Sequence, residues 1–316
     1  MNVKRLLEIP KKRLLKKICG YDEIYTVALR KCEGKTLPEA NTDMPFIPIT
    51  YSKDFWYADP ILFSYQGLDF LFVEEYDRKL CKGQIAVALV SDSPKDMLFK
   101  TIIKEPYHMS FPMIFKWNNQ IFMIPETSEN FSFNIYQAVY FPYEWKCISS
   151  IKTEKKYVDS VVVEKNNQNI VLLCSEICDE NPLKTCFRKF IFNFNNLSII
   201  IPDLDFNQNQ KFNLYDRNAG PIIKIGSSSI IPTQNSNNID YGISIMFRSN
   251  INDKNYNYIT SDSLIIDKMD KEDIIGVHTY SQTKAYEAID IRYMKFSPVM
   301  QYRKIINSKK VFRWNE

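Results

Sequence analysis

Two short apolar runs separated by a turn recur along this chain. In the first copy, an apolar run over residues 56–63 is followed by a turn at Gln66-Gly67 and a second apolar run over residues 70–75, which ends in Glu74-Glu75. Apolar runs of this length between turn residues predict buried β-strands. Because only a short turn separates the runs, the pair predicts a β-hairpin.

The same pattern returns in altered form over residues 110–126, 158–176 and 220–234. If Pro60, Pro112, Ser160 and Pro221 are taken as equivalent positions, the intervals between copies are 52, 48 and 61 residues. A period of this size in strand-type sequence is typical of a β-propeller or another repeat architecture. No long helical periodicity interrupts residues 24–300, so an α/β sheet with helical crossovers is disfavoured.

The repeat therefore predicts an all-β fold, a five-bladed β-propeller that forms a single domain over residues 24–300. Strands of blade one are expected near 58–63, 69–75, 84–90 and 98–103, and those of blade two near 111–116, 121–126, 132–138 and 145–150. Blade three is expected to start at 158 and include 186–194, blade four to start near 219 and include 241–247, and a shorter fifth unit to cover 276–280 and 285–292. Residues 24–29 predict an isolated strand that closes the last blade and so protects its sheet edges.

Charge separates both ends of the sequence from its body. The chain carries a formal charge of +4, but residues 1–17 sum to +6 and residues 303–316 to +4, which leaves −6 for the rest. We therefore distinguish a basic N-terminal segment, residues 1–23, and a basic C-terminal tail, residues 301–316. A mildly acidic body argues against a nucleic-acid partner.

The first 18 residues mix leucines and isoleucines with these cations, and Pro10 interrupts any single helix. One interpretation is a weak peripheral contact with an anionic membrane surface. The alternative is a solvated basic tail, or a helix that caps the propeller. No apolar run approaches the roughly 18 residues that a membrane span needs.

Seven cysteines form an odd set without a CxxC pair, and the sequence shows no signal peptide. We therefore expect reduced thiols and a cytoplasmic location, with peripheral attachment at the inner face of the membrane as the alternative. Cys174 and Cys178 lie four residues apart, but too few further ligands are in view to predict zinc. Phosphate-loop, dinucleotide-binding and HExxH motifs are absent, and Asp203-Leu204-Asp205 lies in an expected loop. We accordingly expect no metal and no cofactor.

Candidate chemistry follows from the repeat, because the first strand of each propeller blade lines the central channel. Residues at equivalent points of different copies should therefore converge although they are distant in sequence. The polar side chains at such points are Asp59, Glu74, Glu75, His108, Glu126, Asp159, Glu176, Arg217, Gln234, His278, Glu287 and Asp290.

Carboxylates on opposite sides of a channel suit glycosyl chemistry, where one acts as acid or base and another stabilises an oxocarbenium-like centre. The predicted catalytic residues are Asp59, Glu126 and Asp159. The predicted substrate-binding residues are Glu75, His108, Arg217, Gln234, His278, Trp56 and Tyr280. Several also have a structural interpretation: the histidines as hydrogen-bonded wall residues, Asp59 as a carboxylate that locks blades or lies in a turn, Glu126 as a solvated strand end, and the aromatic residues as core.

Several segments together resemble one known family. They are Ala58-Asp59-Pro60, residues 72–75, 83–88, 108–112 and 123–128, and then 217–220, 231–234, 241–242 and 276–280. Across about residues 24–292 they are similar to the N-terminal domain of plant glucosamine inositolphosphorylceramide transferase. The later segments, such as Asn218-Ala219-Gly220-Pro221 and Pro232-Thr233-Gln234, are looser versions of the pattern.

The resemblance implies a five-bladed propeller similar to family 43 glycoside hydrolases, in a setting of surface-glycan or glycolipid biosynthesis. In those hydrolases a first-blade Asp before Pro acts as general base, and Asp59 matches that position. Glu126 and Asp159 match the remaining acids only by their blade. The recognised transferase activity of the plant protein belongs to another domain.

The function expected is a glycosyltransferase in surface polysaccharide or glycolipid biosynthesis. Its partners would be a sugar donor, either a nucleotide sugar or a sugar phosphate, and a glycan or glycolipid acceptor. The alternatives are a glycoside hydrolase or phosphorylase, and a non-catalytic propeller that binds glycans.

Overall fold

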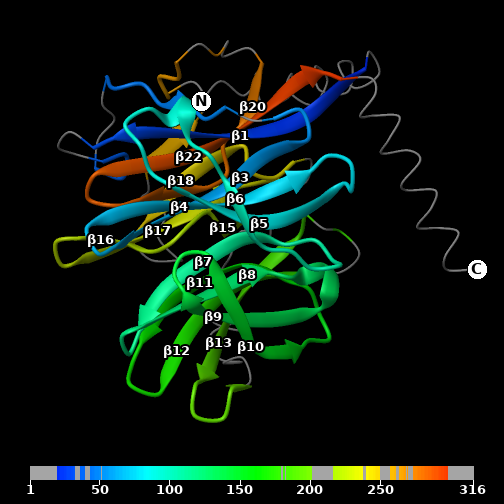
Figure 1. Ribbon diagram of the computed structural model, residues 1–316, viewed down its shortest axis with the longest axis vertical. Helices are drawn as coiled ribbons and strands as arrows, with labels where there is room; N and C mark the ends of the chain where they lie inside the picture. Colours follow the sequence, from blue (N-terminus) through cyan, green and yellow to red (C-terminus); the bar gives the residue numbers. More distant parts are fainter. Residues whose placement is uncertain are drawn as a thin grey trace, which may run out of the picture.

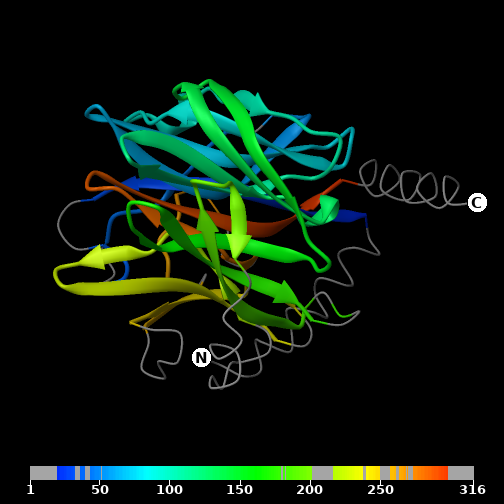
Figure 2. The ribbon, with the colours of Figure 1, turned by 90° about the horizontal axis from the view of Figure 1, so that it is seen from below.

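Antiparallel β-sheets make up almost all of the computed structural model. It describes residues 20–32, 36–39, 43–50, 52–178, 181, 183–200, 216–237, 240–249, 257–260, 263–267, 269 and 273–297. Within these residues the strands form five sheets arranged in a ring (Figures 1 and 2). The predicted all-β, five-bladed propeller is confirmed. Residues 1–19 of the basic N-terminal segment and the whole basic C-terminal tail, residues 301–316, lie outside the described residues.

Blades one to three each consist of four consecutive strands. Blade one contains β3 (Phe55–Tyr65), β4 (Leu68–Asp77), β5 (Lys82–Leu89) and β6 (Lys100–Ile103). Blade two contains β7 (Ser110–Trp117), β8 (Gln120–Glu126), β9 (Ser132–Tyr140) and β10 (Glu144–Lys152), and blade three contains β11 (Tyr157–Lys165), β12 (Asn169–Ile177), β13 (Thr185–Asn193) and β14 (Ser198–Ile200). Two short 3-10 helices, η1 (Pro94–Asp96) and η2 (Ser128–Asn130), lie in loops of blades one and two.

Blades four and five differ because their innermost strand is split in two. Blade four has β15 (Arg217–Asn218) and β16 (Ile223–Ile225) against β17 (Ser228–Asn235), followed by β18 (Ser244–Arg248) and β19 (Asn257–Thr260). Blade five has β20 (Ile274–Gly276) and β21 (Tyr280–Gln282) against β22 (Tyr286–Phe296).

The ring is closed by the first strand of the chain. Strand β1 (Tyr21–Lys31) pairs antiparallel with β22 along its whole length, and β2 (Ile47–Pro48) pairs with β1 at the outer edge. Figures 1 and 2 show the blue β1 beside the orange β22. The strand predicted over residues 24–29 therefore does close the last blade, although it is longer than expected.

A bulge near the start of the innermost strand recurs in the first three blades. The register of β3, β7 and β11 shifts at this point, and Asp59, Phe111 and Asp159 there have φ values of 49°, 44° and 51°. Aspartate tolerates this left-handed conformation better than a bulky residue such as phenylalanine does. A bulge changes the direction of the side chains around it. The recurring bulge therefore directs Asp59 and Asp159 toward the same region.

Gly220 occupies the corresponding point of blade four, with φ of 141°. A Cβ atom added there would lie 1.9 Å from the carbonyl oxygen of Tyr280. The backbones of blades four and five come this close because the Tyr280 N–H donates to the carbonyl of Ala219 at 2.7 Å. Only glycine fits at this contact.

Apolar side chains fill the spaces between neighbouring blades. One cluster, including Phe122 and Phe187, joins blades two and three, and another, including Phe72 and Met123, joins blades one and two. Each fully buried Phe or Ile stabilises the fold by about 1.5–3 kcal/mol. Within the described residues, the structure has no helix with the length and apolar character needed to cross a bilayer.

Candidate active site

A buried acid–imidazole–acid group joins blades one and five. His278, between β20 and β21, has its Nδ1 2.8 Å from Asp290 Oδ2 and its Nε2 3.2 Å from Asp59 Oδ1. The three side chains are at most 9% exposed. Both ring nitrogens thus face a carboxylate, which is the arrangement of a protonated imidazolium.

Backbone and hydroxyl donors hold the two carboxylates of this group. Asp290 Oδ1 accepts the N–H groups of His278 and Thr279 at 3.1 and 2.8 Å, and its Oδ2 accepts the Asp59 N–H at 3.0 Å. Asp59 accepts the Thr279 hydroxyl at 2.9 Å and the Phe111 N–H at 3.1 Å. Asp59 therefore ties blade one to blades five and two, and its contact with Phe111 supports the strained backbone of that residue.

These contacts fix the charges of the group. Burial would raise the pKa of Asp59, but the hydrogen bond and charge of His278, with the donors Thr279 and Phe111, lower it below its ordinary value. Burial would lower the pKa of His278, but Asp290 and Asp59 raise it well above its ordinary value. Asp59 is thus ionised and His278 positively charged at neutral pH.

Asp59, His278 and Asp290 offer donor atoms that are close enough to one another to share a metal ion. An imidazolium has no free lone pair, however, so a metal would have to displace its protons and break both ion pairs. The geometry fits the ion-paired state better than a metal centre.

A second acidic group joins blades two, three and four. Arg217 in β15 has its Nε 2.6 Å from Asp159 Oδ2 and its Nη2 3.8 Å from Glu126 Oε2. Glu126 also accepts the Ser128 hydroxyl at 2.8 Å and the Asp159 N–H at 3.4 Å. The Arg217 guanidinium lies over the ring of Tyr241, 5.3 Å from its centroid.

One cation is too little to keep both of these acids strongly ionised. Burial raises the pKa of Asp159 to about 7, with Arg217 opposing the shift and Glu126 adding to it. Burial likewise raises the pKa of Glu126 against the effect of Arg217. Asp159 therefore exchanges its proton near neutral pH, and the neighbouring Glu126 contributes to that raised pKa.

Glu74 and His108 complete the ring of polar groups. Glu74 Oε1 lies 3.6 Å from His108 Nε2, and it is buried with no hydrogen-bond partner in the described part of the chain. Burial, with the charge of Asp59 as the next cause, raises the pKa of Glu74 well above its ordinary value, which favours its protonated form. Burial lowers the pKa of His108, whose Nδ1 accepts the Gly83 N–H at 2.9 Å.

Gly83 allows this approach. A Cβ atom added to it would lie 2.4 Å from the carbonyl oxygen of Met109 and 2.6 Å from Glu74 Oε1.

The negative charge of Asp59 raises the pKa of Glu74, Glu126 and Asp159 alike. These three acids therefore all lie within electrostatic reach of Asp59, and we refer to the four together as the acidic ring.

Aromatic side chains cover His278 on one side. Trp56 stacks on Tyr76 with ring centroids 4.3 Å apart, and Tyr25 lies 5.0 Å from Trp56 and 5.1 Å from His278. The hydroxyls of Tyr25 and Tyr241 are 3.0 Å apart. Trp56, predicted from the sequence to bind substrate, thus belongs to a wall of aromatic rings beside the acidic ring.

Three residues predicted to bind substrate have their polar groups engaged away from the acidic ring. Glu75 accepts hydrogen bonds from Gln84 and Thr101 at 2.7 and 2.6 Å within blade one. The Gln234 amide donates to the carbonyl of Asn218 at 2.9 Å. The Tyr280 hydroxyl donates to Glu287 at 2.6 Å in the core between blades four and five.

The structure does bring together Asp59, Glu126, Asp159, His108, Arg217 and His278. Glu74 and Asp290 were in the wider candidate set, whereas Tyr25, Tyr241 and Thr279 were not. Tyr241-Gly242 was visible only as part of the family resemblance. Thr279 follows His278 directly, and its hydroxyl-to-Asp59 contact has no signal in the sequence.

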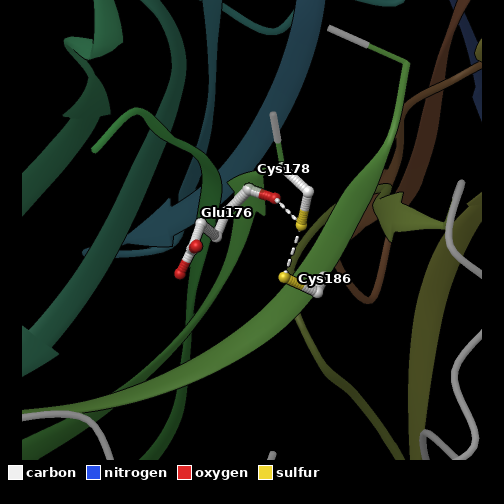
Figure 3. Close-up of side chains that lie close together, drawn as sticks. All are labelled: Glu176, Cys178 and Cys186. Atoms are coloured by element: carbon white, nitrogen blue, oxygen red, sulfur yellow. Dashed lines mark hydrogen bonds between the residues drawn. The ribbon is translucent and has the colours of Figure 1, made fainter. Parts of the chain in front are cut away.

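A further cluster with metal-ligand atoms lies in blade three. Glu176, Cys178 and Cys186 converge across the hairpin of β12 and β13, and the two sulfur atoms are 2.6 Å apart (Figure 3). Glu176 is already paired with Lys155 at 2.5 Å and with Arg188 at 2.6 Å. Two cations against the carboxylate make this a poor site for a metal cation.

The sequence model of one protein family matches most of this chain. The family is described as glucosamine inositolphosphorylceramide transferase 1, N-terminal, and its model matches residues 42–271. The chain belongs to this family. The resemblance read from the sequence is thereby confirmed.

Two plant relatives carry the same description. The proteins named glucosamine inositolphosphorylceramide transferase 1 from Oryza sativa subsp. indica and from Arabidopsis thaliana are 33% and 34% identical to this chain over 108 and 109 residues. The matched region is 34% of this chain but only 14% of each plant protein. The match to this chain thus spans only about one seventh of the length of these relatives.

A solved structure shares the propeller fold. The catalytic domain of Coprinopsis cinerea GH62 alpha-L-arabinofuranosidase superposes with a TM-score of 0.50 at 8% sequence identity, covering 75% of this chain and 90% of that domain. At this identity the similarity concerns the fold alone.

Proposed function

We propose that this protein transfers a sugar from an activated donor to a glycan or glycolipid acceptor at the ring of acids formed by Asp59, Glu74, Glu126 and Asp159. The observation that carries the proposal is the coexistence, within one buried ring, of the ionised Asp59 and of Asp159, whose pKa burial raises to about 7. Glycosyl transfer uses a base to take the proton of the acceptor hydroxyl and a fixed negative charge to stabilise the positive charge that develops on the sugar. The family description, which names a glycolipid-modifying transferase, supports this substrate class.

Asp159 suits the role of general base. A base works best when its pKa lies near the operating pH, and burial raises the pKa of Asp159 to about 7. Its ionised form would accept the proton of an acceptor hydroxyl. Glu126, which shares Arg217 and a backbone contact with Asp159, would then take part in passing that proton on.

Asp59 suits electrostatic stabilisation rather than proton transfer. Its lowered pKa makes it a weak base, and its negative charge is held by His278 and Thr279. A fixed carboxylate stabilises the positive charge that develops at the sugar in an oxocarbenium-like transition state. This assignment differs from the general-base role that the family 43 resemblance implies for Asp59.

The neighbouring groups suit substrate binding. The rings of Trp56, Tyr25 and Tyr76 offer flat apolar faces for a sugar ring. The guanidinium of Arg217 has the planar donor geometry that binds phosphate, so it suits the donor's phosphate. Gln234 lies opposite Arg217 on the neighbouring strand, because β15 and β17 pair at these two residues, and its amide bonds to the carbonyl of Asn218.

The test is an acceptor-dependent transfer assay. Radiolabelled uridine diphosphate N-acetylglucosamine and inositolphosphorylceramide in detergent micelles serve as donor and acceptor probes, and other nucleotide sugars and sugar phosphates follow. We expect labelled glycolipid with the wild-type protein and its loss in Asp159→Asn. The control is Glu176→Gln, which removes an ion-paired carboxylate of blade three outside the ring and should retain turnover.

Other outcomes would overturn the proposal. Labelled free sugar from a glycoside without an activated donor would identify a hydrolase, and glycan binding without turnover on any donor would identify a binding module. The expected location, in the cytoplasm or at the inner face of the membrane, belongs to the same proposal. Cell fractionation that finds the protein outside the cytoplasmic membrane would contradict it.

A further inference from the structure

A cationic groove lies at the outer seam between blades five and one. It occupies about 470 Å³ between the segment that follows β2, the turn after β4, η1 and the end of β22. Its lining includes the side chains of Lys53, Arg78, Lys95 and Lys295, together with the hydroxyl residues Thr50 and Ser52. No acidic residue lines it within the described part of the chain. The groove is distinct from the acidic ring, whose acids lie on β3, β4, β8 and β11.

Arg78 is the unusual member of this groove. It is 6% exposed, and its guanidinium donates to the carbonyl of Lys53 at 3.3 Å and to the Ser297 hydroxyl at 3.4 Å. Its Nε is buried without any hydrogen-bond partner. Among the described residues no carboxylate lies within 4.0 Å of it. A buried guanidinium without an anion is strongly unfavourable, so its surroundings favour a bound anion.

The acids nearest to Arg78 in sequence are bonded to groups other than its guanidinium. Asp77 Oδ1 accepts the N–H groups of Lys79 and Leu80 at 2.8 and 2.9 Å. Asp54 pairs with Lys79 at 2.9 Å. The fold thus gives the exposed Lys79 a carboxylate partner and leaves the buried Arg78 without one.

Hydroxyl groups add donors to the groove. The Ser52 Oγ accepts the N–H groups of Asp54 and Phe55 at 3.1 and 3.0 Å, which leaves its own O–H proton to be donated. An anion with several oxygen atoms could therefore accept from Arg78 and Ser52 together. Phosphate fits better than a carboxylate, because Arg78, Lys53 and Lys295 line the groove beside Lys95, which pairs with Asp267 at 2.9 Å, and a phosphate monoester carries a charge of about −1.5 to −2 at neutral pH. The forked donors of arginine match phosphate oxygens.

The cationic groove continues into a second, more apolar groove. That groove occupies about 480 Å³ and shares Pro48, Ile49, Lys95 and Lys295 with the first. Met294 and Phe296 contribute apolar surface to it, whereas the carboxylates of Asp267 and Asp273 also line it, so a bound phosphate would lie at the Arg78 end. A ligand filling both would carry its phosphate at one end and an apolar group at the other.

We propose that this double groove binds a phosphate group attached to an apolar moiety, with Arg78 as the principal phosphate ligand. Both a lipid with a phosphate headgroup and a soluble phosphorylated compound have this chemistry. The proposal stands on the groove alone and does not depend on the sugar-transfer function.

The first experiment measures phosphate binding by calorimetry with inorganic pyrophosphate as the probe. We expect the wild-type chain to bind it, Arg78→Gln to bind at least about tenfold more weakly, as loss of a charge-assisted fork requires, and Lys79→Gln to bind as the wild type does. Lys79 is the matched control, because its replacement removes the same charge from the adjacent position, outside the groove. Absence of binding to the wild type, or equal weakening in both variants, overturns the proposal.

Thermal unfolding shows whether weaker binding by Arg78→Gln comes from a folding defect. Pyrophosphate should raise the melting temperature of the wild type and of Lys79→Gln but not that of Arg78→Gln. In the absence of pyrophosphate, Arg78→Gln should melt no lower than the wild type, because the unpaired buried charge is gone. An equal pyrophosphate shift in Arg78→Gln would contradict the assignment.

A second arm distinguishes the two sources of phosphate. Sedimentation with phosphatidylcholine vesicles is compared with and without phosphatidic acid, for the wild type and both variants. If phosphatidic acid increases sedimentation of Lys79→Gln more than that of Arg78→Gln, and pyrophosphate competes, the groove takes a lipid phosphate. If the variants sediment alike while pyrophosphate still requires Arg78, it takes a soluble phosphate. Comparing the two variants cancels the contribution of the basic terminal segments, which both retain.

Discussion

The two acidic groups of the candidate site have similar charges but opposite protonation behaviour. Each places two buried carboxyls against one cation, His278 for Asp59 and Asp290, and Arg217 for Glu126 and Asp159. The pKa of Asp59 is lowered, whereas that of Asp159 is raised to about 7. The number of ion pairs therefore does not decide the protonation state.

Hydrogen bonds from the backbone and from hydroxyl groups make the difference. Asp290 accepts three backbone N–H groups, and Asp59 accepts one together with the Thr279 hydroxyl. Asp159 has Arg217 as the partner of its Oδ2, and its own N–H serves Glu126. Donors aimed at a carboxylate favour its charged form, and their scarcity leaves burial to dominate. One group is thus built to hold charge, and the other to exchange a proton.

The largest expected effect concerns catalysis by the second group. Asp159→Asn should lower kcat for sugar transfer by about 10²–10⁴-fold, since it removes the proposed general base. The protein should remain folded, because Asn keeps the shape and one acceptor oxygen for Arg217. Transfer kinetics beside circular dichroism provide the measurement. Undiminished kcat would remove Asp159 from the mechanism.

A large effect on stability is expected from the first group. Asp290→Ala removes the acceptor of three backbone N–H groups and one partner of His278, so it should reduce the free energy of unfolding by about 3–5 kcal/mol. Urea unfolding followed by tryptophan fluorescence measures this. Asp92→Ala, at an exposed carboxylate paired with Lys31, is the control and should leave the urea midpoint nearly unchanged. Similar midpoints for the two variants would refute the comparison.

The two groups should also give opposite pH dependences of stability. For Asp159 the folded pKa of about 7 lies above the ordinary 3.8, so its contribution is complete below about pH 4 and is lost as the pH rises toward 7. For Asp59 the folded pKa lies below 3.8, so its contribution is present at neutral pH and is lost as the pH falls through that lower value.

This dependence can be isolated with one variant. Between about pH 4 and about pH 8, Asp159→Asn should lose less unfolding free energy than the wild type, because the raised carboxyl is gone. Urea midpoints across this range supply the measurement. Parallel curves for the two proteins would mean that Asp159 titrates normally.

The smallest effect is expected at Glu74. Because burial raises the pKa of Glu74 and so favours its protonated form, which Gln resembles, Glu74→Gln should change the free energy of unfolding by less than about 1 kcal/mol. Its neighbour provides the contrast, since Asp59→Asn removes a charge that His278 requires. A destabilisation by Glu74→Gln as large as that by Asp290→Ala would show that Glu74 is ionised.

Much of the fold was accessible from the sequence because the repeat is a local pattern. The hairpins around Pro60, Pro112 and Ser160 lie where their apolar runs and turns predicted them. Equivalent positions then brought Asp59 and Asp159 to one region. The split inner strands of blades four and five were not predicted, because their contacts, such as Gly220 with Tyr280, cross between blades.

The orientation of individual side chains was less accessible. Glu74 and Glu75 are adjacent on a strand and must face opposite ways, but the bulge at Asp59 hides which of them faces the ring. Tyr280 and Gln234 sit on predicted inner hairpins, yet their polar groups bond within the core. Tyr25 reaches His278 only because β1 joins the last blade, and no local pattern encodes that distance.

The most direct test of the contrast is a carboxyl-carbon NMR titration of Asp59 and Asp159, with signals assigned by Asp59→Asn and Asp159→Asn. The account predicts that Asp159 titrates near pH 7 and that Asp59 stays ionised down to below pH 3.8. Titration of Asp159 near pH 3.8, or of Asp59 above it, would contradict the claim that the two groups hold opposite protonation states.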